Sequence, residues 1–435
     1  MKSKIAILLI VLLPLTAQAE LSIQITQGVD NPIPIAVVPF AWQGSGVLSE
    51  DIEQIVINDL EQVGEFRALS PANMLSMPTQ EDQVFYRDWR VLAQDYLLVG
   101  KIDRAPGSQL VQVQYEFFDI NRETKLAGEI LTGSVTQLRD IGHEISNVVF
   151  ELVTGTRGAF TTQILYIVSE ELGPDNMIYR LEKSDYDGQR AQVLLESGEP
   201  IMSPSWSPNG QEIAYVSFET SLPRIYTQNI ATGQRRQITN YPNINSSPVW
   251  SPDGNRLAMV LSKDGNPEIY VQDLRTNELV RVTNHPAIDT EPSWSTDGRS
   301  IVFMSDRTGQ PQIYQMEIGA NSFDIERLTF ECFQCMKAQF LPDGVNLVHV
   351  RRETRQDPNY QISILNVETL RVLPLTDTSL DESPSVAPNG SMIIYATKFA
   401  GRGVLDAVSI DGRVRFRLPS TQGDVREPSW SPFFN

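Results

Sequence analysis

Residues 203–217 read SPSWSPNGQEIAYVS, and degraded copies of this phrase return five more times before the chain ends. The clearest copies are SPVWSPDGNRLAMVLS from Ser247 and EPSWSTDGRSIVFMSD from Glu291. Recurrence at a nearly fixed distance is the signature of a repeat architecture, in which each copy is one structural unit. One marker residue can be followed through all six copies, at spacings of 44, 44, 46, 46 and 44 residues: Trp206, Trp250, Trp294, Phe340, Val386 and Trp430.

Each copy has the pattern of a four-stranded unit. A short strand carries the marker residue, a turn on Asn-Gly or Asp-Gly follows, and an alternating apolar strand comes next. Residues 225–230 and 269–274 show a third strand, and a repeated threonine such as Thr239 ends the fourth. Four strands in about 45 residues match one blade of a β-propeller. The chain is therefore predicted to be mainly β, with a six-bladed β-propeller over residues 156–435 preceded by a small α/β domain.

The two ends of the repeat predict how the ring closes. Residues 163–169, QILYIVS, match the second strand of a blade, but no marker strand precedes them. The last marker strand, around Trp430, has no second strand after it. The repeat contains six marker strands and six second strands, and each marker strand has a second strand to pair with only if the two ends of the repeat join in a ring. We therefore expect residues 427–433 to complete the blade that runs from Ile164 to about Leu195. The marker residues are expected to fill the wedges between neighbouring sheets, with ligand stacking as the alternative.

The first 19 residues have the pattern of a secretory signal peptide. Lys2 and Lys4 precede an apolar run at 5–13, and Ala17-Gln18-Ala19 is a typical cleavage site before Glu20. The nine apolar residues are too few to cross a bilayer core, which needs roughly 20. The mature chain is therefore expected to be exported and not embedded in a membrane.

The charge of the chain bears on its partners. The formal net charge is −19, and removing Lys2 and Lys4 makes it −21. Such an excess repels nucleic acid at long range and attracts a protein with a basic patch. The alternative is that the acidic residues only keep the protein soluble.

Residues 20–155 have a different pattern from the repeats, with strands expected at 33–40, 95–102 and 110–120. A helix is predicted after Ser49 as N-cap, and a second helix over 135–153. Gly155 to Gly158 forms a short linker that allows hinge motion between the domains. The apolar stripes of the two helices are Ile52, Ile55, Val56, Leu60 and Val63, and then Leu138, Ile141, Ile145, Val149 and Leu152.

The signal with its Ala-x-Ala site, the strand NPIPIAVVPF at 31–40, and six PSWSPDG-like repeats closed by EPSWSPFFN at 427–435 resemble the TolB family. These are periplasmic propeller proteins of the Tol–Pal envelope system in Gram-negative bacteria. The resemblance implies a monomer that binds the lipoprotein Pal and communicates with TolA at the inner membrane. It also implies a role in outer-membrane integrity and cell division, with contacts to other envelope proteins and use by bacteriocins for import.

The resemblance also indicates where each partner binds. Pal is expected on the loops that enter the inner strands, at 243–247, 287–291 and 380–383. TolA is expected to bind the switchable segment 20–27, through Glu20, Leu21, Ile23 and Ile25, with a plain edge strand as the alternative. The residues assigned to the Pal face are Ile244, Asn245, Ser247, His285, Asp289, Thr290, Glu291, Asp381 and Glu382.

Signals for catalysis are few. His143-Glu144 is followed by Asn147, so the HExxH metalloprotease motif fails, and no GxSxG or phosphate-binding glycine motif occurs. His143 lies off its apolar stripe and is expected on the surface, whereas His349 is expected to be structural. No catalytic, cofactor or metal residue is assigned. A cation in the central channel, or an exported hydrolase or sugar-processing enzyme, stays open because carboxylates gather at the inner strands: Asp289, Glu291, Asp381, Glu382, Asp424 and Glu427.

Cys332 and Cys335 have the CxxC spacing of a redox centre or half a zinc site. No second CxxC exists, and the export route leads to an oxidising compartment. A local disulfide in a loop between blades is the favoured prediction, with free thiols or redox exchange as alternatives.

Overall fold

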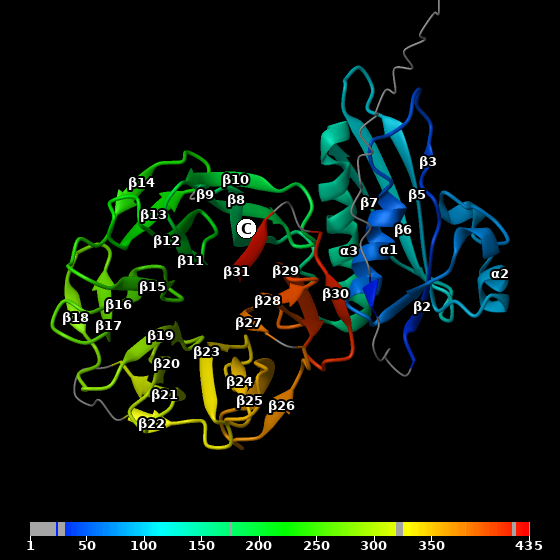
Figure 1. The fold of residues 1–435 in the computed structure, drawn as a ribbon. Coiled ribbons are helices and arrows are strands. Elements are labelled where there is room, and N and C mark those ends of the chain that lie inside the picture. The colour runs from blue at the N-terminus through cyan, green and yellow to red at the C-terminus, as the bar shows by residue number, and fades with distance from the viewer. Residues whose placement is uncertain are drawn as a thin grey trace, which may run out of the picture.

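The computed structural model describes residues 31–174, 176–318, 325–378, 380–419 and 423–434, together with the backbone of residues 23 and 24. The predicted signal peptide, and Glu20, Leu21 and Ile25 of the segment assigned to TolA, lie outside the described residues. Figure 1 shows a ring of small sheets beside a separate layer of helices and sheet. Among the described residues, none of the helices combines the length and apolar character needed to cross a membrane.

The ring contains six blades, each with four antiparallel strands, as the repeat predicts. The first three blades are β31 (Asp424–Trp430), β8 (Gln163–Gly173), β9 (Asn176–Asp185) and β10 (Gln192–Ser197); β11 (Ile201–Trp206), β12 (Glu212–Ser217), β13 (Arg224–Asn229) and β14 (Arg235–Gln237); and β15 (Asn245–Trp250), β16 (Arg256–Leu261), β17 (Glu268–Asp273) and β18 (Leu279–Arg281).

The remaining blades follow the same order from the channel outward. They are β19 (Asp289–Trp294), β20 (Ser300–Ser305), β21 (Gln312–Glu317) and β22 (Ile325–Arg327); β23 (Gln334–Phe340), β24 (Asn346–Arg352), β25 (Gln361–Asn366) and β26 (Val372–Pro374); and β27 (Glu382–Val386), β28 (Met392–Phe399), β29 (Arg402–Ser409) and β30 (Arg415–Arg417).

The ring closes as the repeat count predicts, because β31 pairs antiparallel with β8. The closing strand covers 424–430 rather than 427–433. It begins earlier because Asp424 and Val425 already lie opposite Ser169 and Val168.

The six marker residues are buried, each only 7–8% exposed. Trp206 packs with residues of the preceding blade, including Leu165 and Ile167, and Trp250 packs in the same way against Val216. The expectation that these residues fill the wedges between sheets is therefore confirmed.

The N-terminal domain is a mixed sheet in the order β4-β2-β5-β6-β7, with β3 also paired to β5. Helices α1 and α3 lie between this sheet and the propeller (Figure 1). The elements are β2 (Ile33–Val37), β3 (Ala41–Trp42), α1 (Ile52–Gln62), β4 (Phe66–Ala68), η1 (Pro71–Asn73), η2 (Glu81–Gln83), α2 (Tyr86–Val91), β5 (Tyr96–Arg104), β6 (Val111–Asp119), β7 (Thr124–Gly133), η3 (Val135–Gln137) and α3 (Leu138–Thr154).

Three expectations about these helices were wrong. The N-cap of α1 is Asp51 rather than Ser49, and its side chain makes no capping hydrogen bond. Leu152 is 48% exposed, because the last turn of α3 packs Val153 against the core instead. His143, expected on the surface, is only 2% exposed, because the side of α3 that bears it is covered by α1 and by the propeller turn around Tyr186.

The linker between the domains is held against α3. The Asn147 side chain accepts a hydrogen bond from the Phe160 amide at 2.9 Å and donates one to the Thr161 hydroxyl at 3.0 Å. The Phe160 ring packs edge-on against Phe150 of α3 and Tyr186 of the propeller, with centroid distances of 5.6 Å. One hydrophobic core runs through both domains, and this packing argues against the hinge that the glycines suggested.

Candidate functional site

The two ends of the ring differ in what covers them. At one end lie the loops that enter each inner strand, such as 238–244 and 282–288, and the loops from the second to the third strand, such as 218–223. We call this end the loop face. The N-terminal domain contacts turns at the opposite end, where the Asn389 side chain donates a hydrogen bond to the carbonyl oxygen of Arg157 at 3.0 Å and Tyr186 reaches α1. Among the described residues, these contacts leave the loop face open.

Large apolar side chains are exposed on the loop face of every blade. Each is 40–59% exposed, and they come from loops or strand ends that lie far apart in the sequence. Exposed apolar groups that gather on one face commonly mark a surface for another protein. The residues are Leu172, Met202, Leu222, Ile244, Ile288, Phe330 and Phe399.

Six of the nine residues assigned to the Pal face are accessible on the loop face. Ile244 and Glu382 are exposed, and four more are partly exposed: Ser247, His285, Thr290 and Glu291. His285 also shapes its own loop, because its amide donates to Glu268 Oε1 at 2.8 Å and its Nδ1 accepts from the Ala287 amide at 3.0 Å.

The other three assigned residues, Asn245, Asp289 and Asp381, are fully buried. Asn245 donates hydrogen bonds to the carbonyl oxygens of Tyr241 and Asn243, at 2.9 and 3.1 Å. A buried side chain cannot touch a partner directly, so these three assignments are corrected. Their role is to hold the loops of the face in place.

Neighbouring side chains neutralise or hydrogen-bond the two buried aspartates. Arg307 donates to both carboxylate oxygens of Asp289, at 3.0 and 2.9 Å. Asp381 accepts hydrogen bonds from the hydroxyls of Thr376, Thr378 and Thr397. Burial raises the pKa of both carboxyl groups, and these hydrogen-bond donors oppose that rise. Neither group is a free carboxylate of the kind that a glycosidase pair requires.

The channel is lined by one backbone feature repeated around the ring. Each inner strand has one residue with φ between 49° and 56°, and all six of these residues line a cavity of about 620 Å³. A positive φ is uncommon for residues other than glycine, and here it accompanies a bulge in every inner strand. The residues are Ser203, Ser247, Glu291, Lys337, Ser383 and Glu427.

The carboxylates of this ring are occupied by the next blade. Glu291 accepts a hydrogen bond from the Lys337 amide at 2.8 Å and lies 3.5 Å from the Lys337 ammonium. Glu427 accepts from the Ser203 amide. The cation expected in the channel therefore stays a prediction. Among the described residues, the group of His, Asp, Glu or Cys side chains close enough to surround an ion lies elsewhere, at His143, Asp185 and Asp187.

Cys332 and Cys335 are joined by a disulfide bond in this structure. The pair lies at the loop-face end of the fifth blade, beside Phe330. Cys335 is the second residue of β23 and is buried, so only Cys332 lies in the loop between blades.

The segment assigned to TolA is described only at its centre. The backbone of β1 (Ile23–Gln24) pairs antiparallel with β30, with Ile23 opposite Phe416 and Gln24 opposite Arg415. This adds a fifth strand to the outer edge of the sixth blade. An edge strand was the alternative left open for this segment.

Sequence reasoning missed most of the apolar residues on the loop face, including Leu222, Ile288 and Phe330. The available signal was the presence of large apolar residues in segments otherwise rich in turn formers, as at TSLP (220–223). They can be recognised as one surface only in the structure, where they lie at the same end of the ring.

Comparison with known proteins covers both domains. The family model described as the TolB beta propeller domain matches residues 150–434, and the one described as the TolB amino-terminal domain matches residues 21–126. The Tol-Pal system protein TolB of Pseudomonas aeruginosa is 54% identical over 432 residues, or 99% of each chain. That of Pseudomonas syringae pv. tomato is 52% identical over 423 residues, covering 97% of this chain and 96% of the relative.

A solved structure agrees with these matches. The crystal structure of TolB from Acinetobacter baumannii superposes with a TM-score of 0.86 at 37% identity, covering 95% of this chain and 100% of that chain. Both domains, in the same order, are shared at an identity well above that of chance resemblance between propellers. The chain therefore belongs to the TolB family of the Tol–Pal system.

Proposed function

We propose that the chain is a periplasmic protein-binding component of the Tol–Pal system that binds the lipoprotein Pal on the loop face and contacts TolA through residues 20–27. Through these contacts it maintains outer-membrane integrity and supports cell division. The observation that carries the proposal is the set of exposed apolar side chains on every blade of the loop face, the end of the ring that the N-terminal domain leaves open.

The sixth blade supplies a physical link between the two partners. Its sheet runs in the order β1-β30-β29-β28-β27, so the TolA segment is attached at the outer edge. The same sheet reaches the loop face at Glu382 of β27 and Phe399 of β28. A partner that shifts these loop residues can change the pairing of β1 with β30, and the coupling must then work equally in both directions.

The binding experiment measures affinity for the soluble domain of Pal. The variant Ile244→Asp/Ile288→Asp places two charges on the loop face, and the matched control Val193→Asp/Val280→Asp places them on the outer strands β10 and β18, where both valines are similarly exposed. The loop-face variant is expected to bind at least tenfold more weakly, because buried charges at an interface are costly. Equal affinity of the two variants, with unchanged unfolding temperatures, would overturn the proposal.

The second contact is tested by removing residues 20–27 from the mature chain. TolA binding should be lost. Pal should still bind, because the residues of the loop face are kept, but its affinity should change, because the deletion removes the β1–β30 pairing to which that face is coupled. TolA binding that survives the deletion would contradict the assignment of the segment.

A further inference from the structure

A group of buried polar side chains lies where the two domains meet. We call it the interdomain cluster: Asp59 of α1, Arg139 and His143 of α3, Asp185 at the end of β9, and Asp187 in the turn that follows. Asp59 and His143 are 1% and 2% exposed, and Asp185 and Asp187 are 5% and 7% exposed. Charged groups are rarely this deeply buried in a protein without a role or a partner for each charge.

His143 is held with one ring nitrogen toward each domain. Its Nδ1 lies 2.8 Å from Asp59 Oδ2, and the other oxygen of Asp59 accepts a hydrogen bond from the Tyr186 hydroxyl at 2.6 Å. Because an ionised carboxylate can only accept, Nδ1 carries the proton. In the neutral imidazole, Nε2 is then left with a lone pair.

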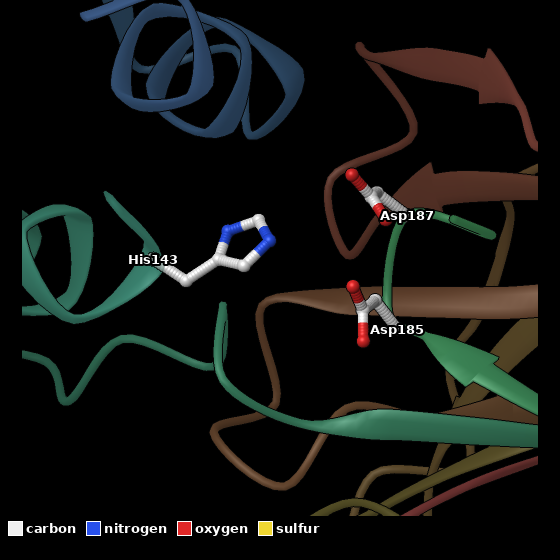
Figure 2. Close-up of side chains that lie close together, drawn as sticks. All are labelled: His143, Asp185 and Asp187. Carbon is white, nitrogen blue, oxygen red and sulfur yellow. The ribbon is translucent and has the colours of Figure 1, made fainter. Parts of the chain in front are cut away.

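His143 Nε2 has no hydrogen-bond partner among the residues described. Figure 2 shows the imidazole with its free edge turned toward the carboxylates of Asp185 and Asp187. One ligand atom from each of these three residues lies within 4.8 Å of the others. A buried nitrogen without a partner, aimed at two carboxylates, has the donor set of a metal site.

The charges around this point do not balance. Among the described residues, five carboxylates are joined in ion pairs to two arginines and to His143, which leaves three negative charges before His143 is counted; the carboxylates are Glu50, Asp59, Asp140, Asp185 and Asp187, and the arginines are Arg139 and Arg190. The arginines do not use up the acceptors. Asp187 accepts one hydrogen bond from Arg139 at Oδ2 and one from the Gln189 amide at Oδ1. Because each carboxylate oxygen has two lone pairs, each of these oxygens keeps a lone pair for a further ligand.

We propose that the interdomain cluster binds one zinc ion through His143 Nε2 and one carboxylate oxygen each from Asp185 and Asp187. An imidazole ligand favours zinc over calcium, which prefers oxygen ligands alone. Asp59 then orients the histidine through its hydrogen bond with Nδ1, as carboxylates commonly do for zinc-binding histidines. Two atoms that each lie about 2.1 Å from an ion are at most about 4.2 Å apart, so binding draws the three groups slightly together.

The site joins the two domains. His143 comes from the helix of the N-terminal domain, and both aspartates come from the first blade of the propeller. A bound ion therefore fixes α3 to the turn after β9 and stabilises the folded chain by its binding free energy. Its burial gives it a structural role, away from the loop face.

The test is zinc titration of the mature protein after removal of metals by a chelator. Wild type is expected to bind one equivalent of Zn²⁺ and to unfold at a higher temperature with zinc than without, and Ca²⁺ should have no such effect. His143→Gln should weaken zinc binding at least 100-fold, and Asp59→Asn by about 10–100-fold. The matched control is His285→Gln, a partly exposed histidine on the loop face, which should bind zinc as wild type does.

A second measurement keeps the test valid if a variant folds poorly. The chain has only three histidines, so nitrogen NMR of the wild-type imidazoles reports each one separately. One equivalent of zinc should shift Nε2 of His143 and leave His285 and His349 unchanged. The proposal is overturned if zinc shifts only His285, if His143→Gln binds zinc as wild type does, or if Ca²⁺ stabilises the protein equally.

Discussion

Trp430 lies opposite Ile164 across the first blade, so residues 266 positions apart form one antiparallel pair. The Trp430 indole also donates a hydrogen bond to the Thr162 hydroxyl at 2.8 Å. In every other blade the first four strands from the channel outward are consecutive in the sequence. The closure of the ring therefore depends on this one strand from the end of the chain.

Deletion of residues 427–435 should lower the unfolding temperature by about 10 °C or more, because it removes the buried Trp430 and leaves β8 unpaired at Ile164 and Leu165. Thermal unfolding followed by circular dichroism measures the effect. The control removes only residues 434 and 435, which lie beyond β31, and should cost far less. An unchanged unfolding temperature in the longer deletion would mean that the ring does not need its closing strand.

Tyr186→Phe should lower the free energy of unfolding by about 1–3 kcal/mol, because Asp59 loses a donor in a buried position while the packing of the ring is kept. Tyr395→Phe is the matched control. Tyr395 is equally buried, but its hydroxyl has no hydrogen-bond partner among the described residues, so this substitution should be close to neutral. Chemical denaturation of both variants decides the comparison, and equal losses would show that the contact with Asp59 contributes little.

The architecture was predictable because it depends on a periodic pattern. The markers Trp206 and Trp250 recur at a fixed spacing, and the incomplete copies at both ends predict the ring and its closure without any knowledge of contacts. The bounds of β31 were missed by three residues, because Val425 is paired through its backbone with Val168, and backbone pairing leaves little trace in the side-chain pattern.

The errors concern residues whose surroundings come from distant parts of the chain. His143 was judged from its own helix alone, yet Asp59 lies 84 positions before it and Asp187 lies 44 positions after it. Asp289 was assigned to a partner because it precedes an inner strand, whereas Arg307 of the next loop in its blade binds it. In both cases the sequence shows the residue type but not the element that covers it.

Substitution of Cys332 and Cys335 by serine should lower the free energy of unfolding by at most about 2 kcal/mol, because the disulfide closes a very short loop. The mass of the alkylated, unreduced protein should show no added label, and reduction should expose both thiols. Labelling of two thiols without reduction would show that the cysteines are free, and the loop beside Phe330 would then be less constrained.

The pH dependence of stability should carry a contribution from His349. Burial lowers the pKa of this imidazole from 6.5 to about 4, and the positive charge of Arg351 acts in the same direction. In the unfolded chain the group takes up a proton near pH 6.5, so the contribution to stability is fully present above that pH and is lost as the pH falls toward 4. The difference between the two pKa values corresponds to about 3 kcal/mol. His349→Leu, which cannot titrate, should therefore lose less stability between pH 7 and pH 4 than wild type in chemical denaturation, whatever its stability at pH 7. If both proteins lose the same amount, protonation of His349 does not contribute to acid unfolding.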